Sequence, residues 1–148
     1  MIEHPRIINR PHLGREEVGV TVAGANFTWT PPARTHVEII SVFLELTTNA
    51  TVTTRRVRLV IGGVADDDVM IIATGVQPAN QVWRYHFVRG QGSTSGAPAI
   101  DGWCSAWPMG LLFQNPEQLR SDITNLQAGD QITLHTIRYQ MWQDPVII

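Results

Sequence analysis

An alternation of large apolar and polar side chains, with a period of two residues, constrains the fold of this chain more than any other feature. It is clearest in residues 82–88, where Trp83, Tyr85 and Phe87 share one face and Arg84 lies on the other. This period is typical of a β-strand buried on one face, whereas an amphipathic helix repeats about every 3.6 residues. Similar short segments recur between turns spaced about 8–15 residues apart, and no segment has the pattern of a helix of conventional length.

These segments predict an all-β domain of about eight strands, an antiparallel β-sandwich or barrel that is jelly-roll-like and carries an extended N-terminal arm. Residues 37–46 are apolar on both faces in their middle, which is typical of a central strand. In the last strand, residues 131–142, the apolar phase shifts after Leu134. The shift predicts a β-bulge or a sheet-switching bend near Thr136. A single helical turn is expected at residues 115–120.

The 148 residues fit one domain of ordinary size, which can bury a core without a disulfide or a metal. We expect three parts: an extended N-terminal arm at residues 1–17, a β-sandwich domain at 18–143 and a C-terminal tail at 144–148. Pro5 and Pro11 interrupt any regular element in the arm.

Aliphatic and arginine side chains in the arm and the tail predict a partner-binding role. A frayed terminus is the alternative, although a frayed tail is usually more polar and less aliphatic. The candidate partner-binding residues are Ile2, Arg6, Ile7, Ile8, Arg10, Leu13, Arg15, Val146, Ile147 and Ile148.

No constellation of catalytic or metal-binding residues is recognisable, and we expect no enzyme activity, no catalytic residue, no cofactor and no metal site. All 11 basic residues are Arg, which excludes the chemistry that depends on Lys. The 5 His residues are scattered, without the spacing of a zinc site. Asp66–Asp68 could bind calcium, but three carboxylates at a solvated hairpin tip also discourage edge pairing of strands. Cys104 has no neighbouring His in the sequence and is expected to be a buried, inert thiol.

Two tryptophans beside the Gly- and Ser-rich loop at residues 90–102 are the remaining candidates. Trp103 and Trp107 either pack the end of the domain or anchor a partner as exposed aromatics. In the second case, the loop and the tryptophans could form a carbohydrate-binding site. The net charge of −2 leaves no basic excess, so no direct binding of nucleic acid is expected. No run of about 18 apolar residues exists, so no membrane partner is expected.

Two stretches have a recognisable order of strands and turns. Residues 36–61 read HVEIISVFLELTTNATVTTRRVRLVI: an aliphatic strand, a Thr-rich turn and a strand that contains two adjacent Arg residues. Residues 107–142 contain a Pro-x-Gly segment, a polar turn, a Gly-Asp turn and a long strand ending in an aromatic residue. Together these stretches resemble small virion structural proteins of tailed bacteriophages, of the decoration, neck or tail type.

The resemblance transfers no catalytic residue, and it implies a jelly-roll or related β-barrel body, extended termini and symmetric oligomers. We therefore expect a capsid decoration (cement) protein that binds and stabilises a bacteriophage head through its β-body and its termini. Its partners would be other virion proteins, above all the major capsid protein, and further copies of itself, with a trimer favoured. It would be located in the virion, which is assembled in the host cytoplasm. The alternatives are a phage neck or tail structural protein and a carbohydrate-binding module that uses Trp103 and Trp107.

Overall fold

The computed structural model describes residues 12–63, 67–73, 75–90 and 103–143. These residues form ten strands and no helix, and hence no helix that could span a membrane. The strands are β1 (His12–Gly19), β2 (Thr28–Trp29), β3 (Thr35–Thr47), β4 (Arg58–Gly62), β5 (Asp67–Ile72), β6 (Val82–Arg89), β7 (Trp103–Trp107), β8 (Leu112–Gln114), β9 (Gln118–Ser121) and β10 (Gln131–Gln143).

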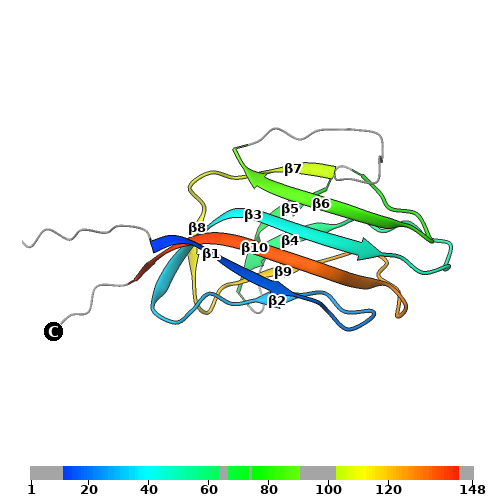
Figure 1. The fold of residues 1–148 in the computed structure, drawn as a ribbon, viewed down its shortest axis with the longest axis horizontal. Helices are drawn as coiled ribbons and strands as arrows, with labels where there is room; N and C mark the ends of the chain where they lie inside the picture. The colour runs from blue at the N-terminus through cyan, green and yellow to red at the C-terminus, as the bar shows by residue number, and fades with distance from the viewer. Residues whose placement is uncertain (1–11, 64–66, 74, 91–102, 144–148) are drawn as a thin grey trace, which may run out of the picture.

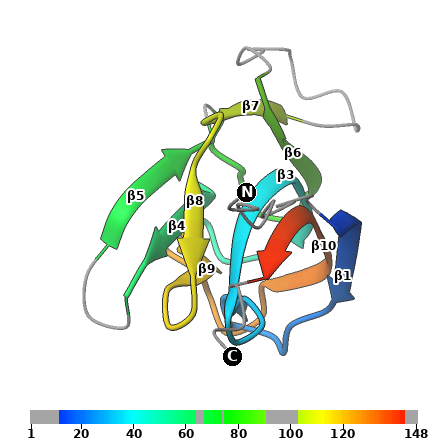
Figure 2. The ribbon, with the colours of Figure 1, turned by 90° about the vertical axis from the view of Figure 1, so that its left-hand side faces the viewer.

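The strands form two sheets, which we call sheet A and sheet B. Sheet A has the order β1-β10-β3-β6-β7, with β8 paired to a further part of β3, and sheet B has the order β2-β9-β4-β5. All strand pairs are antiparallel except β6 and β7. The sheets lie in separate layers (Figures 1 and 2), so the described strands make an open two-layered arrangement and no closed barrel. The prediction of an all-β, mainly antiparallel fold is confirmed.

The hydrophobic core lies between the two sheets, because each contributes its inward-facing residues. In β6, Tyr85 and Phe87 are fully buried and Trp83 packs against the core, as the alternation predicted. Sheet B contributes alternate residues such as Leu59 and Leu119, which are also fully buried. Alternation therefore determines which face of each strand meets the other sheet.

Strand β10 contains the predicted change of phase, at a slightly earlier position. Its pairing with β3 slips between Ile132 and Leu134, so Thr133 has no residue opposite it, whereas the sequence placed the irregularity near Thr136. The extra residue is a β-bulge, which allows Ile132 and Ile137 to be buried together although their sequence parity differs. A second slip leaves Ile40 of β3 without an opposite residue.

The segment predicted as an arm, residues 1–17, contributes to sheet A from His12 onward. Residues 12–19 form β1, an edge strand in which Arg15 lies opposite Tyr139 of β10. Residues 1–11 and 144–148 lie outside the described residues, so the structure carries no information on the larger part of the arm or on the tail.

Residues 118–121 form strand β9, where the sequence suggested part of a helical turn. Leu119 is fully buried and lies opposite Ile61 of β4, and β9 also pairs with β2 on its other side. Tertiary pairing on both sides therefore outweighs the weak local preference of this short segment.

Candidate functional site

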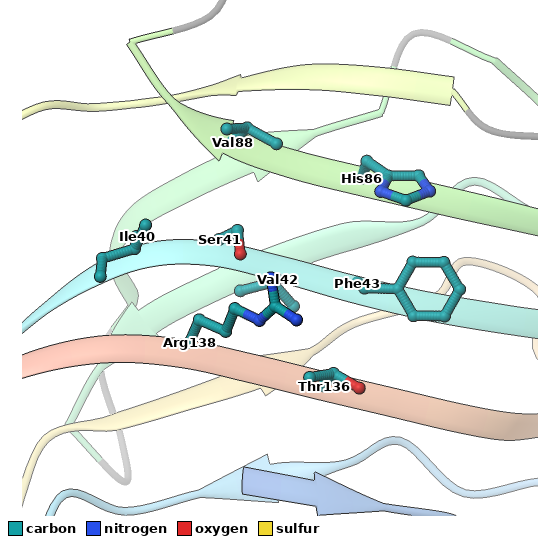
Figure 3. Close-up of a pocket in the computed structure, with 8 residues that line it drawn as sticks. All are labelled: Ile40, Ser41, Val42, Phe43, His86, Val88, Thr136 and Arg138. Atoms are coloured by element: carbon teal, nitrogen blue, oxygen red, sulfur yellow. The ribbon is translucent and has the colours of Figure 1, made fainter. Parts of the chain in front are cut away.

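A hollow of about 520 Å³ lies in the outer face of sheet A, which is the face turned away from sheet B. Strands β3, β6 and β10 form its floor (Figure 3). Its lining residues are Ile40, Ser41, Val42, Phe43, His86, Val88, Thr136 and Arg138.

The strand register explains why these side chains gather. One row of directly opposed residues crosses β1, β10, β3 and β6. In this row Val18 lies opposite Thr136, Thr136 opposite Phe43, and Phe43 opposite His86. Directly opposed residues point to the same face of a sheet. Because neighbouring strands are about 4.8 Å apart, the row brings residues that are distant in sequence within reach of one another.

The β-bulge in β3 belongs to the hollow itself. Ile40 has no opposite residue in β10, and both Ile40 and the next residue, Ser41, line the hollow and are partly exposed. A bulge re-aims side chains and increases the local twist of the sheet. The hollow therefore lies where the pairing of β3 with β10 is irregular. A regularly paired sheet would have a flatter surface at this place.

An aromatic pair forms one wall of the hollow. The ring centroids of Phe43 and His86 are 4.7 Å apart, and the planes are inclined by 67° in an edge-to-face arrangement. Aromatic pairs favour this arrangement because the edge of one ring is positive and the face of the other is negative. Opposite this wall, Figure 3 shows the Arg138 side chain extending over β3 towards Ser41 and Val42.

Three ion pairs between side chains surround the apolar centre of this face. Their shortest N–O distances are 2.7 Å for Arg138 and Glu16, 2.8 Å for Arg84 and Glu45, and 3.1 Å for Arg89 and Glu38. Hydrogen bonds from Arg84 and Thr133 lower the pKa of Glu45, against the opposing effect of its partial burial. Glu45 is thus charged at neutral pH, and each of the three carboxylates is paired with an arginine. An apolar centre with a neutral polar rim is an arrangement suited to binding another surface.

A ridge of exposed valines stands beside the hollow. Val18, Val20 and Val22 are 61%, 68% and 75% exposed, and we call these three residues the valine ridge. Between them, Gly19 and Thr21 approach β10: a Cβ atom on Gly19 would lie 2.6 Å from the His135 ring, and Thr21 donates a backbone hydrogen bond to Ile132. Since alternate residues of an extended chain point to opposite sides, the valines project away from this contact.

Of the predicted partner-binding residues, the structure describes two. Leu13 and Arg15 lie in β1, where Arg15 is exposed; the side chain of Leu13 is outside the description. Ile2, Arg6, Ile7, Ile8, Arg10, Val146, Ile147 and Ile148 lie outside the described residues. The register does fix where the two segments attach. His12, at the start of β1, lies opposite Met141, close to the end of β10.

Trp107 is a core residue. Its side chain is 2% exposed at the end of β7 and belongs to the main hydrophobic cluster, which favours the packing alternative over an exposed anchor. Trp103 and Cys104 also lie in β7, but their side chains and most of the preceding loop are outside the described residues. A carbohydrate site that needs both tryptophans on the surface is therefore not supported by Trp107.

Of the acidic run Asp66–Asp68, Asp67 and Asp68 begin β5, but their side chains are not described, and Asp66 lies outside the described residues. Within the described part of the chain, no three His, Cys, Asp or Glu side chains come together as a metal site. The most deeply buried charges, Arg55 and Asp130, bind one another and the surrounding backbone. They hold the fold together and do not open onto the hollow.

Sequence reasoning did not identify the hollow, although one signal pointed to it. Residues 37–46 were recognised as apolar on both faces, and a central strand covered on both sides explains such a pattern. In the structure, the inward face of β3 meets the core, while Ile40 and Phe43 lie on the outward face. The sequence could not show that the second face is left without a covering layer among the described strands.

Comparisons with known proteins do not assign the chain to a family. No protein-family model matches the sequence, and neither curated proteins nor solved structures give a significant match.

Proposed function

We propose that this chain is a virion structural protein, a capsid decoration protein that binds a bacteriophage head through its β-body and through the segments that precede β1 and follow β10. One observation carries the proposal. Because His12 lies opposite Met141, residues 1–11 and 144–148 are attached side by side at one end of sheet A. Two segments that carry aliphatic side chains, both of which were predicted to bind a partner, are therefore joined to the same end of the body.

The strand order supports a jelly-roll reading of the fold. If β7 and β8 are set aside as an insertion between β6 and β9, eight strands remain. Sheet A then has the order β1-β10-β3-β6, which are the first, last, third and sixth of these eight strands. Sheet B has the order β2-β9-β4-β5, which are the second, the penultimate, the fourth and the fifth of the same eight strands. This alternation between two four-stranded sheets is the order of a jelly roll, an architecture that viral capsid proteins use and that also occurs in lectins and cupins.

The physical mechanism of binding follows from the chemistry of the two segments. An extended segment can add as a strand to an exposed sheet edge, where backbone hydrogen bonds give affinity and side-chain pockets set the register. Ile2, Ile7 and Ile8 would fill such pockets, and Arg6 and Arg10 would pair with carboxylates. On a shell with many equivalent sites, linked weak contacts gain avidity.

The test is co-sedimentation with heads from which the protein has been removed. We expect the full chain to bind, and variants lacking residues 1–11 or residues 144–148 to lose most of their binding while their bodies stay folded. Arg6→Glu and Arg10→Glu together serve as a charge test within the arm, with Arg34→Glu, an exposed arginine in the body, as the matched control. Full binding by a body without both segments would contradict the proposal.

A position at the neck or in the tail is the alternative within the same class. The two locations differ in copy number, because a head surface offers many equivalent sites and a neck or tail ring offers few. Imaging of intact particles with a labelled chain separates them.

A further inference from the structure

We infer that two copies of this chain pair through the outer faces of their A sheets, around a two-fold axis, with the valine ridge of each copy seated in the hollow of the other. The inference rests on the proposed function only for the expectation that the chain works as an oligomer. It adds the surface, the partner and the symmetry, and it concerns a contact other than the one made by the terminal segments.

This face has an apolar centre whose side chains remain partly exposed in the described part of the chain. Ile40, Phe43 and Val88 all line the hollow, whereas residues at the solvent face of a sheet are usually polar. Every strand of the described part belongs to sheet A or to sheet B, and sheet B packs on the opposite side (Figure 2). An exposed apolar surface framed by polar groups marks an interaction site.

The valine ridge also favours a partner on this face. β1 is an edge strand, and natural edge strands are usually blunted by charges or by proline. This edge carries charges at Arg15, Glu16 and Glu17, but its continuation then presents Val18, Val20 and Val22, each more than half exposed. The described part of the chain leaves these valines largely exposed, so a second surface accounts for them best.

Val18, the first residue of the valine ridge, lies on the same face as the hollow, at a spacing that suits self-pairing. Val18 and Phe43 belong to one row and are separated by two strand spacings, or about 10 Å. A two-fold axis that lies between the two sheets, runs along the strands and passes over Thr136 places Val18 of each copy over Phe43 of the other. A contact between two identical surfaces of this kind is isologous and closes as a dimer.

The ion pairs on the outer face of sheet A balance one another in charge. The face carries the pairs Glu16–Arg138, Glu45–Arg84 and Glu38–Arg89, so two copies would bring together surfaces that are neutral overall. Glu16 and Arg138 lie two residues along their strands from Val18 and Thr136, and so lie close to the axis. In the dimer, Glu16 of one copy could pair with Arg138 of the other.

The experiment measures self-association of the full chain, without particles, by sedimentation velocity and light scattering over a wide range of concentrations. We expect a dimer whose dissociation constant rises by at least about tenfold in the double variant Val18→Arg, Val20→Arg. The substituted side chains are exposed, so the fold should tolerate the change, and circular dichroism and thermal unfolding verify that it does. Val52→Arg, at a position that is 96% exposed and belongs to no strand of sheet A, is the matched control and should leave the dimer intact.

Hydrogen exchange at low and high concentration provides the second readout. We expect amides around Val18, Phe43 and His86 to gain protection as the dimer forms. A chain that stays monomeric, a trimer, or a dimer that ignores the two arginines would overturn the inference. So would amide protection around these three residues that is the same at low and at high concentration, because a second copy would then not cover this face.

These outcomes are separable from those of the proposed function. A monomer that still binds heads through residues 1–11 and 144–148 refutes the dimer and leaves the decoration role standing. A dimer that is disrupted by the ridge substitutions, but does not bind heads, refutes the decoration role alone.

Discussion

Arg55 and Asp130 form a bidentate ion pair in which both side chains are completely buried. Nε of Arg55 donates to Oδ2 of Asp130, and Nη2 donates to Oδ1, both at 2.9 Å. The remaining guanidinium hydrogens are donated to the carbonyl oxygens of Thr51 and Thr53 and to the side-chain oxygen of Asn49. Asp130 also accepts backbone hydrogen bonds from residues 49 and 127. The pair therefore ties the loop before β4 to the turn before β10.

Replacing either partner should destabilise the protein strongly. Arg55→Lys cannot reproduce the five-donor fork, and Asp130→Asn leaves the guanidinium buried without its counter-charge. We expect each variant to lower the free energy of unfolding by about 3–5 kcal/mol, measured by urea denaturation. Arg138→Lys is the control, because the pair with Glu16 is largely exposed, and exposed pairs contribute at most about 1 kcal/mol. Equal effects at both sites would contradict the structural role of the buried pair.

Stability should fall as the solution is acidified, in two stages. Burial lowers the pKa of His135 from its ordinary value of 6.5, so below that pH the unfolded chain takes up a proton that the folded chain resists. Burial opposes ionisation of Asp130, but hydrogen bonds from Arg55 and from two backbone amides outweigh it and lower its pKa below 3.8. Near pH 4 the unfolded chain therefore binds a proton at Asp130 that the folded chain does not, and the free energy of unfolding falls a second time.

The measurement is the free energy of unfolding between pH 8 and about pH 3, for the natural chain and for His135→Gln. We expect the loss just below pH 6.5 to be reduced in the variant, because its side chain does not titrate there. The same pH profile in both proteins would show that burial of His135 makes no contribution.

Gly24 should not tolerate a side chain. Its φ is +74°, and a Cβ atom would lie 2.9 Å from the backbone Cα of Ala128, so Gly24→Ala combines a strained conformation with a close contact. We expect a loss of about 1–3 kcal/mol on thermal or urea unfolding. Gly63→Ala is the control, since no atom lies within 4 Å of its Cβ position. A loss as large at Gly63 as at Gly24 would argue against the described approach of the two loops.

Removing residues 1–17 should cost more stability than removing residues 1–11. The longer deletion takes away most of β1, including Arg15 and Glu17, which lie opposite Tyr139 and Ile137 of β10. It exposes the edge of β10 and the Tyr139 ring beneath. A melting temperature that is the same for both truncations would mean that β1 is not held against the sheet, and would restore the longer boundary of the arm.

Much of the fold follows from local pattern, because alternation identifies a strand and its buried face. Trp83, Tyr85 and Phe87 face the core as predicted, and the shift of phase in β10 correctly indicated a bulge. The position of the bulge at Thr133 could not be derived, since it depends on which β3 residue lies opposite. The same limit explains why β9 was missed: its pairing partners lie in distant parts of the sequence.

The candidate site was less predictable than the fold. The hollow joins residues from three strands, and only the register reveals that Thr136, Phe43 and His86 are neighbours. The terminal residues were chosen for their composition, and the structure adds that the two segments attach at one end of sheet A. Trp107 had two interpretations that depended on burial, a quantity that the sequence around it did not determine.

The most direct test of the proposed role is a quantitative protein inventory, by mass spectrometry, of purified phage particles produced by the genome that encodes this chain. We predict that the chain is present in many copies, in a fixed ratio to the major capsid protein that persists through repeated purification. Its absence from particles whose other structural proteins are all detected would contradict the proposal.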